Sequence, residues 1–356
     1  MKGYLEEQVN GKDVFVGVDV HKSQWHVTIR TEEQEVFSGS IPGEWEALQG
    51  LLKRCKRSAS RVKVVYEASG FGFWLHDHLV GWGCQCLVTP PSLMPQESGN
   101  RVKTDRRDSR KLAFMVAKGM LKGVWVPSRK ERFHRQVSRR RRQLVKNRIR
   151  VQNQIKSELR FHGFPCPATQ GPWSRKFVER LWCIRFGDRF MQESFTRLLE
   201  QFAFLSKQIE QQSSLLRELS ETALYKDRLA ILTSTYGIGV VTGMEILLEL
   251  QDVARFRRGC ELAAYVGLTP SQYSSGDKVR MGRITKAGKP SVRAALVESA
   301  WALIRKDGAM REKYETLKAR SGAKRAIVAI ARILLLRLRR MLLDGQPYAA
   351  GLVVSQ

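Results

Sequence analysis

The segment from Val14 to Val20 places the strongest constraint on how this 356-residue chain can fold. It reads VFVGVDV, an almost unbroken apolar run with a single carboxylate, Asp19, near its end. Such a run is typical of a strand that is buried on both faces of a sheet. A carboxylate in that position is costly unless it is paired or bound to a metal. The segment therefore predicts a buried strand that ends at a binding site for a cation.

Two later segments repeat this combination of apolar residues and acids. Residues 62–66 form a second apolar run, which ends on Glu67. Asp105 and Asp108 lie three residues apart at the start of a predicted helix, and they therefore share one of its faces. If the two strands lie side by side, we expect Asp19, Glu67, Asp105 and Asp108 to surround a divalent metal. Taken singly, each acid could instead be a helix cap, a turn residue or a solvated surface group.

The pattern of apolar residues over residues 1–125 predicts one α/β domain. The expected elements are strands at 14–19, 25–29 and 36–37, a helix at 44–55, a strand at 62–67, a helix at 71–79, a strand at 86–88 and a helix at 105–121. The order βββαβαβα is typical of a mixed sheet with helices packed on it.

The charge of the chain indicates its class of partner. Lys and Arg number 62 against 34 acids, which gives a net charge of +28. This excess predicts a polyanion partner, with nucleic acid as the first candidate. A membrane is not expected, because no apolar run approaches the roughly 18 residues of a spanning helix. None of the six cysteines forms a C-x-x-C pair, so we expect reduced thiols in a cytoplasmic protein.

Residues 126–225 are predicted to form a separate, helical and basic domain. The segment Arg129–Arg150 contains eleven Lys or Arg and one acid, on a thin helical stripe of apolar residues. Such a helix should repel itself unless phosphates neutralise it, so we expect it to bind nucleic acid and to release it at high salt. The residues expected to make these contacts are Arg139, Arg140, Arg141, Arg142 and Lys146. An inert basic helix is the alternative.

A second long helix is predicted from Met191 to Leu224. Its apolar residues recur with a heptad spacing, as in a coiled coil. The helix could pair with a second subunit, or it could pack against the basic helix of the same chain. The sequence leaves both arrangements open.

Residues 226–356 are predicted to form a mainly helical C-terminal domain. The segment Thr235–Gly239 is similar to a helix-hairpin-helix turn, in which Gly237 and Gly239 would let backbone N–H groups approach a phosphate. Plain glycine punctuation between two helices explains it equally well. A loop is expected at residues 273–278, and the cations Lys278, Arg280, Arg283 and Lys286 follow Ser275 along the chain. Ser275 could lie against a phosphate, although its spacing alone favours an ordinary turn serine.

These motifs resemble those of a known family, the DEDD-type insertion-sequence transposases. Residues 17–22, 66–70 and 103–108 resemble its three acidic motifs, which belong to an N-terminal RuvC-like domain of the RNase H fold. Residues 235–239, 263–270 and 273–276 resemble segments of its second domain, which carries a nucleophilic serine. One departure is Ser109, which replaces the alanine more usual after the last aspartate.

The resemblance implies a chemistry for particular residues. Asp19, Glu67, Asp105 and Asp108 match the metal-binding acids, and Ser275 matches the serine that becomes covalently joined to DNA. Mg²⁺ suits these hard oxygen ligands, with Mn²⁺ as a substitute. The family further implies an element-encoded guide RNA, target and donor DNA, and a dimer of dimers in which one chain's acids act with another chain's serine. The expected location is the cytoplasm of a prokaryote, close to the nucleoid.

Two other functions compete with a transposase that rejoins DNA through phosphoserine. A metal-dependent nuclease or junction resolvase would use the same acids to activate water, and Ser275 would then be only a turn residue. A non-catalytic nucleic-acid-binding protein would use the basic helix and the glycine hairpin alone. The acids at the ends of two buried strands argue against this last reading.

Overall fold

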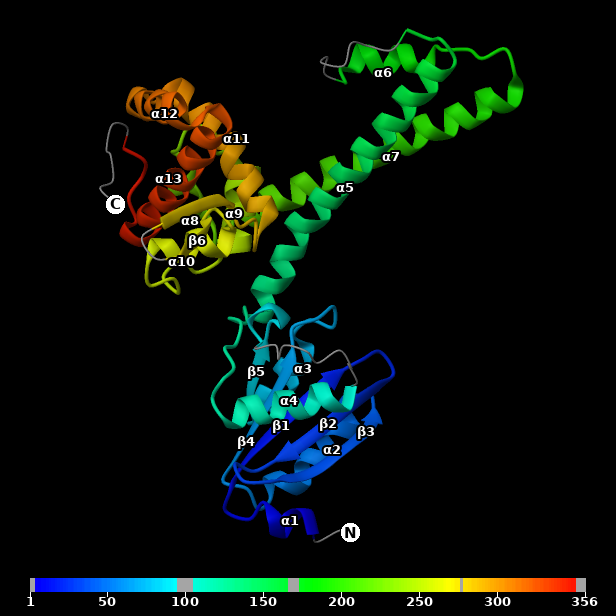
Figure 1. Cartoon of the computed structure of the whole chain (residues 1–356). Helices are drawn as coiled ribbons and strands as arrows, with labels where there is room; N and C mark the ends of the chain where they lie inside the picture. Colours follow the sequence, from blue (N-terminus) through cyan, green and yellow to red (C-terminus); the bar gives the residue numbers. More distant parts are fainter. Residues whose placement is uncertain (1–3, 95–104, 166–172, 276–277, 350–356) are drawn as a thin grey trace. The chain divides into compact units, whose positions relative to one another are not determined.

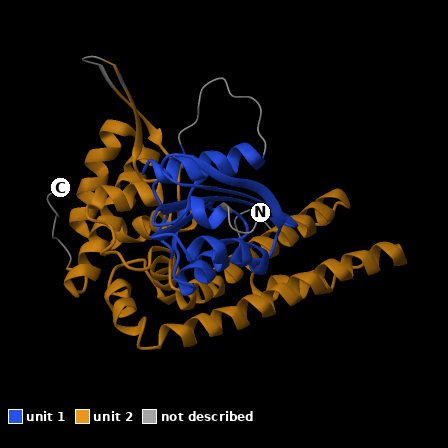
Figure 2. Ribbon diagram, turned by 90° about the horizontal axis from the view of Figure 1, so that it is seen from below, with its two compact units in different colours: residues 1–126 blue, residues 127–356 orange. Residues whose placement is uncertain are grey.

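The computed structural model describes residues 4–94, 105–165, 173–275 and 278–349. The chain divides into two compact units, residues 1–126 and residues 127–356 (Figure 2). The second unit contains both of the segments that the sequence divides at residue 225, and that finer division stays a prediction.

The first unit contains the elements that the sequence predicts, in the predicted order (Figure 1). They are β1 (Asp13–Val20), β2 (Gln24–Arg30), β3 (Glu35–Pro42), α2 (Trp45–Lys56), β4 (Arg61–Glu67), α3 (Trp74–Gly81), β5 (Gln85–Thr89) and α4 (Asp105–Ala117). Two short elements were not predicted, the helix α1 (Tyr4–Gln8) and the 3₁₀ turn η1 (Pro91–Leu93). The order βββαβαβα and the mixed sheet are therefore confirmed.

The five strands form one sheet in the order β3-β2-β1-β4-β5. β1 runs antiparallel to β2 and parallel to β4, with Val18 opposite Tyr66. The next residues along these two strands are Asp19 and Glu67, so both acids lie at the same edge of the sheet. The expectation that the two acid-bearing strands are neighbours is confirmed.

The two faces of the sheet are covered by different helices. Val14, Val16 and Val18 share one core with residues of α2 and α3. Phe15 and Val65 pack against α4 on the other face. Because side chains alternate along a strand, Asp19 and Glu67 belong to the face that α4 covers.

Gly17 allows α4 to lie very close to the sheet. A Cβ atom at this position would lie 2.1 Å from the backbone oxygen of Ser109 and 2.6 Å from the backbone nitrogen of Ala113. No other residue type fits under the helix without moving it. The glycine therefore sets how closely the first turn of α4, which carries Asp105 and Asp108, approaches the end of β1.

The second unit is mainly helical. Its elements are α5 (Arg129–Phe161), α6 (Arg175–Trp182), α7 (Arg189–Ser220), α8 (Lys226–Thr233), α9 (Val240–Leu250), α10 (Gly259–Val266), β6 (Pro270–Ser275), β7 (Lys278–Ile284), α11 (Pro290–Lys306), α12 (Gly308–Ser321) and α13 (Ala323–Asp344). A large apolar core joins α8 to α13. Among the described residues, no helix is both long enough and apolar enough to span a membrane.

The two long helices α5 and α7 pack along each other within one chain (Figure 1). Ile155 and Leu159 of α5 share a core with Phe195 and Phe202 of α7. Nearer the other end of the pair, the Gln212 side chain donates to the backbone oxygen of Val137 at 3.2 Å. Gln212, a polar residue of α7, therefore contributes to the same intrachain contact.

The prediction of a loop at residues 273–278 is wrong, because this segment belongs to an antiparallel hairpin. β6 and β7 pair from Pro270 opposite Ile284 to Ser275 opposite Lys278. Gly276 and Asp277, at the tip, lie outside the described residues. The sequence of residues 270–275, PSQYSS, shows no regular apolar alternation, so it is the pairing with β7 that makes this segment a strand.

Candidate active site

The first unit holds a cluster of two acids and a histidine at the edge where β1 ends. Nε2 of His21 lies 3.1 Å from Oδ2 of Asp19 and 3.5 Å from Oδ1 of Asp105. One ligand atom from each of the three residues lies within 4.8 Å of the other two. Asp19 comes from β1, Asp105 from the first turn of α4, and His21 from the turn after β1. A group with this geometry could hold one cation.

Asp108 and Glu67 belong to the surroundings of this cluster. The charge of Asp108 is close enough to raise the pKa of Asp19. Glu67 ends β4 beside the end of β1, is half-buried, and belongs to the same face of the sheet. The fold thus brings the backbone positions of all four predicted acids to one edge, and it adds His21 to them.

The surroundings of Asp19 perturb its pKa. Its pKa is raised above the usual value, mainly because burial disfavours the charged carboxylate. His21 acts in the opposite direction and lowers the pKa, while the nearby charges of Asp105 and Asp108 raise it further. A bound divalent cation would offset the energetic cost of burying the Asp19 carboxylate. It would also reduce the repulsion between this carboxylate and the other acids. The donor set, carboxylate oxygens with one imidazole, fits such an ion.

The sequence alone did not assign a role to His21. The signal was present, because a histidine two residues after an acid at a strand end can turn back toward that acid. Nε2 of His21 is within 3.5 Å of both carboxylates, so the imidazole bridges Asp19 and Asp105.

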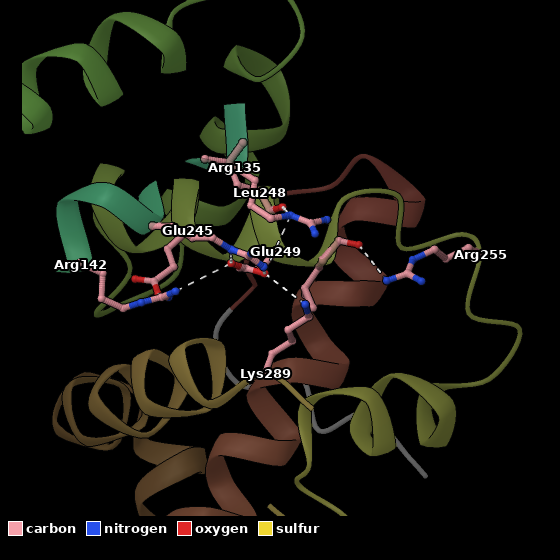
Figure 3. Close-up of polar contacts among 9 residues, drawn as sticks. Arg135, Arg142, Glu245, Leu248, Glu249, Arg255 and Lys289 are labelled. Carbon is pink, nitrogen blue, oxygen red and sulfur yellow. Dashed lines mark hydrogen bonds and ion pairs between the residues drawn. The ribbon is translucent and has the colours of Figure 1, made fainter. Parts of the chain in front are cut away.

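The basic helix α5 is partly neutralised by acids from within its own unit (Figure 3). Arg139 donates to both carboxylate oxygens of Glu249, at 2.7 Å and 3.0 Å. Arg142 pairs with Glu245, and Lys289 lies 3.5 Å from Glu249. The premise that only phosphate could neutralise this helix is therefore wrong for these arginines. Acids more than a hundred residues away do so, and the local charge pattern of α5 gives no sign of them.

The other predicted cations of α5 have different surroundings. Arg141 donates to the hydroxyl of Ser213 on α7 at 2.8 Å. Arg140 and Lys146 are exposed, and Arg140 bonds only the neighbouring Gln143 side chain among the contacts of the described residues. Nucleic-acid binding by this helix stays a prediction, and of the five residues predicted to make these contacts Arg140 and Lys146 are the exposed ones.

The two glycines of the α8–α9 turn have different roles. A Cβ atom on Gly237, whose φ is 84°, would lie 2.6 Å from Cβ of Ala302, and the Ser299 hydroxyl donates to the Gly237 oxygen at 2.9 Å. Gly237 is therefore needed for close packing on α11. Gly239 precedes the first residue of α9, and a Cβ atom added there would meet open space among the described residues. Residues 233–239 line an open hollow of about 570 Å³.

Ser275 ends β6 and is exposed. Arg280 and Arg283 on β7 are exposed as well, and the side chain of Lys278 lies outside the described residues. Lys286 follows β7 with a φ of 56°, a left-handed conformation that is uncommon for a residue with a side chain. The hairpin thus presents a serine hydroxyl on a strongly positive ribbon.

Comparison with known proteins identifies two matching families along the chain. Residues 16–164 match the family of IS110-type DEDD proteins, described as "Transposase". Residues 229–315 match a family described as "Transposase IS116/IS110/IS902 family". The first match contains all four predicted acids, and the second contains the glycine turn and Ser275.

Several curated proteins are similar over most of the chain. A putative transposase of Sinorhizobium fredii is 28% identical over 82% of this chain and 72% of its own length. The transposase for insertion sequence element IS1533 of Leptospira borgpetersenii is 22% identical over 94% of this chain and 97% of its own. The transposase for element IS1111A of Coxiella burnetii is 26% identical over 75% and 74%.

Proposed function

The chain belongs to the IS110 family of DEDD transposases and is a DNA transposase, and from this premise we propose that it cuts and rejoins DNA through a covalent phosphoserine at Ser275. The observation that supports the metal-dependent part of the proposal is the cluster of Asp19, His21 and Asp105 at the edge of the sheet, and the exposed position of Ser275 on the same hairpin as Arg280 and Arg283 supports its part as the nucleophile. The proposed reaction needs a metal site and a nucleophile, and the chain offers a candidate for each. In the proposed assembly of two dimers, the acids of one chain act with the serine of another.

Asp19, Glu67, Asp105 and Asp108 would hold Mg²⁺, or Mn²⁺ in its place. When bound, the cation would neutralise the non-bridging oxygens of the scissile phosphate and so make the phosphorus easier to attack. His21 keeps Asp19 and Asp105 close together. The raised pKa of Asp19 indicates that this carboxylate gains from a cation beside it.

Ser275 would supply the nucleophile. Its hydroxyl oxygen forms a bond to phosphorus, the bond from phosphorus to the leaving DNA oxygen breaks, and the serine proton passes to a base while the leaving oxygen gains a proton. Arg280, Arg283 and Lys278 would stabilise the charge on the phosphate during this exchange. Because one ester replaces another, the strand can be rejoined without ATP.

Nucleic-acid contacts are proposed outside the chemistry as well. Arg140 and Lys146 of α5, Gly239 and Lys286 would contact backbone phosphates of target DNA, donor DNA or a guide RNA. The exposure of Arg140 and Lys146 supports their inclusion. Such a protein would act in the cytoplasm, close to the nucleoid.

A covalent-adduct experiment tests the proposal. Wild-type protein, a DNA carrying element ends, the candidate RNA and Mg²⁺ should give a protein–DNA species that survives denaturing electrophoresis. Ser275→Ala should give none, while the matched control Ser274→Ala should keep it. An adduct that persists in Ser275→Ala would refute the role of this serine. DNA cleavage without any adduct in the wild type would favour the alternative, a nuclease that activates water.

A further inference from the structure

Ser109, the residue after Asp108, is fully buried and its hydroxyl has three partners. It lies 2.9 Å from Nδ1 of His26, 2.8 Å from Oγ1 of Thr28 and 3.2 Å from the backbone oxygen of Arg106. His26 and Thr28 belong to β2, whereas Ser109 belongs to α4. The hydroxyl therefore joins the helix that carries two acids to the central sheet.

The direction of each hydrogen bond follows from what the groups can do. A serine hydroxyl has one hydrogen to donate and two lone pairs to accept with. The Arg106 oxygen can only accept, so Ser109 donates to it. Thr28 and His26 then donate to Ser109, which assigns the imidazole hydrogen to Nδ1. All three positions on the Ser109 hydroxyl are used in this arrangement.

The partners of Ser109 lie directly beside the acid cluster. In the pairing of β1 with β2, His26 is opposite Asp19 and Thr28 is opposite Gly17. The backbone oxygen of Ser109 also fills the place that a Cβ atom on Gly17 would need. The same residue thus contacts β1 through its backbone and β2 through its side chain.

We propose that Ser109 is a positioning residue that fixes the first turn of α4, and through it Asp105 and Asp108, in the orientation that binds the metal. This inference rests on the proposed metal site. Apolar packing alone is non-directional and would let a helix turn or slide by a fraction of an ångström. The two directional bonds to His26 and Thr28 restrain the helix that holds both acids against β2. Supporting contacts of this kind affect metal affinity even though they do not touch the ion.

The test measures Mn²⁺ affinity of the full-length protein by titration calorimetry, at a temperature at which every variant remains folded. Ser109→Ala should bind Mn²⁺ about tenfold more weakly than the wild type. Thr28→Val, which keeps the side-chain shape and removes one partner, should give a smaller loss in the same direction. Ser38→Ala is the matched control, because its hydroxyl lies 3.2 Å from Oγ1 of Thr28 on the neighbouring strand β3. This control should bind Mn²⁺ as the wild type does.

Asp19→Asn separates a failure of this inference from a failure of the metal site. If the wild type binds Mn²⁺, Asp19→Asn abolishes binding and Ser109→Ala leaves it unchanged, the metal site stands and the positioning role of Ser109 is overturned. If Asp19→Asn leaves binding unchanged, the proposed site itself is wrong, and the inference falls with it. A lower melting temperature of Ser109→Ala with wild-type affinity would mean a structural role only, and would likewise overturn the inference.

Discussion

At the scale of single residues, Asp19 of the first unit faces opposite demands from cation binding and from the stability of the fold. Its carboxylate is largely removed from water and lies near two other acids. The same features that would favour a bound cation make the metal-free fold less stable. Gly17 lies two residues earlier on the same face of β1. Because it has no side chain, α4, which carries Asp105 and Asp108, can pack close to this strand.

The Asp19→Asn variant should be more stable than the wild type in the absence of metal at neutral pH. The pKa of Asp19 is raised above 3.8 by burial, so the folded state binds this proton more tightly than the unfolded state does. Wild-type stability therefore falls as the pH rises from 3.8 through the raised value, whereas asparagine carries no such penalty. Urea unfolding with a chelator between pH 3 and pH 8 measures the difference.

The difference between the two proteins should vanish at the acid end of that range, where Asp19 is protonated in both states. This serves as the internal control. A variant that is less stable than the wild type at pH 7 without metal would show that Asp19 contributes to the fold itself.

At the scale of elements, Glu249 of α9 determines how the basic helix is held. Its side chain is 2% exposed and lies within ion-pairing distance of three arginines of α5, Arg135, Arg139 and Arg142, and of Lys289 at the start of α11 (Figure 3). Arg135 also donates to the backbone oxygen of Leu248. One buried acid therefore joins three helices of the second unit.

Glu249→Gln should lower the free energy of unfolding by about 3–5 kcal/mol, because it leaves several partly buried cations without their counter-charge. Chemical denaturation followed by circular dichroism measures this loss. Glu193→Gln is the matched control, since Glu193 is exposed and pairs with Arg197 on α7. That change should cost less than about 1 kcal/mol. Equal losses in the two variants would contradict the role of Glu249.

The stabilisation that Glu249 provides through its ion pairs with α5 and Lys289 depends on pH. Burial raises the pKa of Glu249, but the hydrogen bond and charge of Arg139, with Lys289 and Arg135, lower it more, so that the pKa lies below the usual 4.5. The stabilisation is therefore complete above pH 4.5 and disappears as the pH falls through the lowered value.

For the whole molecule, the net charge of +28 overstates the charge that is available to a partner. Several arginines of α5 are committed to Glu245 and Glu249. Arg140 and Lys146 remain exposed on the same helix. Which cations face a nucleic acid is thus decided by the packing of the second unit and not by the density of arginine along the chain.

Replacing both Arg140 and Lys146 by alanine should weaken binding to a non-specific DNA duplex and reduce its salt dependence. Each lost phosphate contact should lower the slope of log K against log[salt] by about 0.9. Fluorescence anisotropy between about 50 mM and 200 mM salt measures the slope. Arg197→Ala is the control, because Arg197 is exposed but pairs with Glu193 and Glu200. A slope that stays the same in the double variant would show that Arg140 and Lys146 do not contact the DNA.

The sequence by itself determined most of the local elements of the first unit, whereas the strands β6 and β7 of the second unit were not predicted. Apolar runs and periodicity gave the strands, the helices and the order of the first unit, because burial selects residues by their spacing along the chain. Asp19 and Glu67 were chosen because a carboxylate at the end of a buried strand needs a partner wherever that strand lies. Asp105 and Asp108 were chosen because residues three apart share one face of a helix.

Only the tertiary structure decided which distant residues meet. Glu249 neutralises Arg139 across more than a hundred residues, Ser109 bonds His26 and Thr28 on another strand, and Gly237 is needed for a helix that follows sixty residues later. None of these contacts leaves a local pattern, because hydrogen bonds and ion pairs depend on distance in space and impose no periodicity on the sequence.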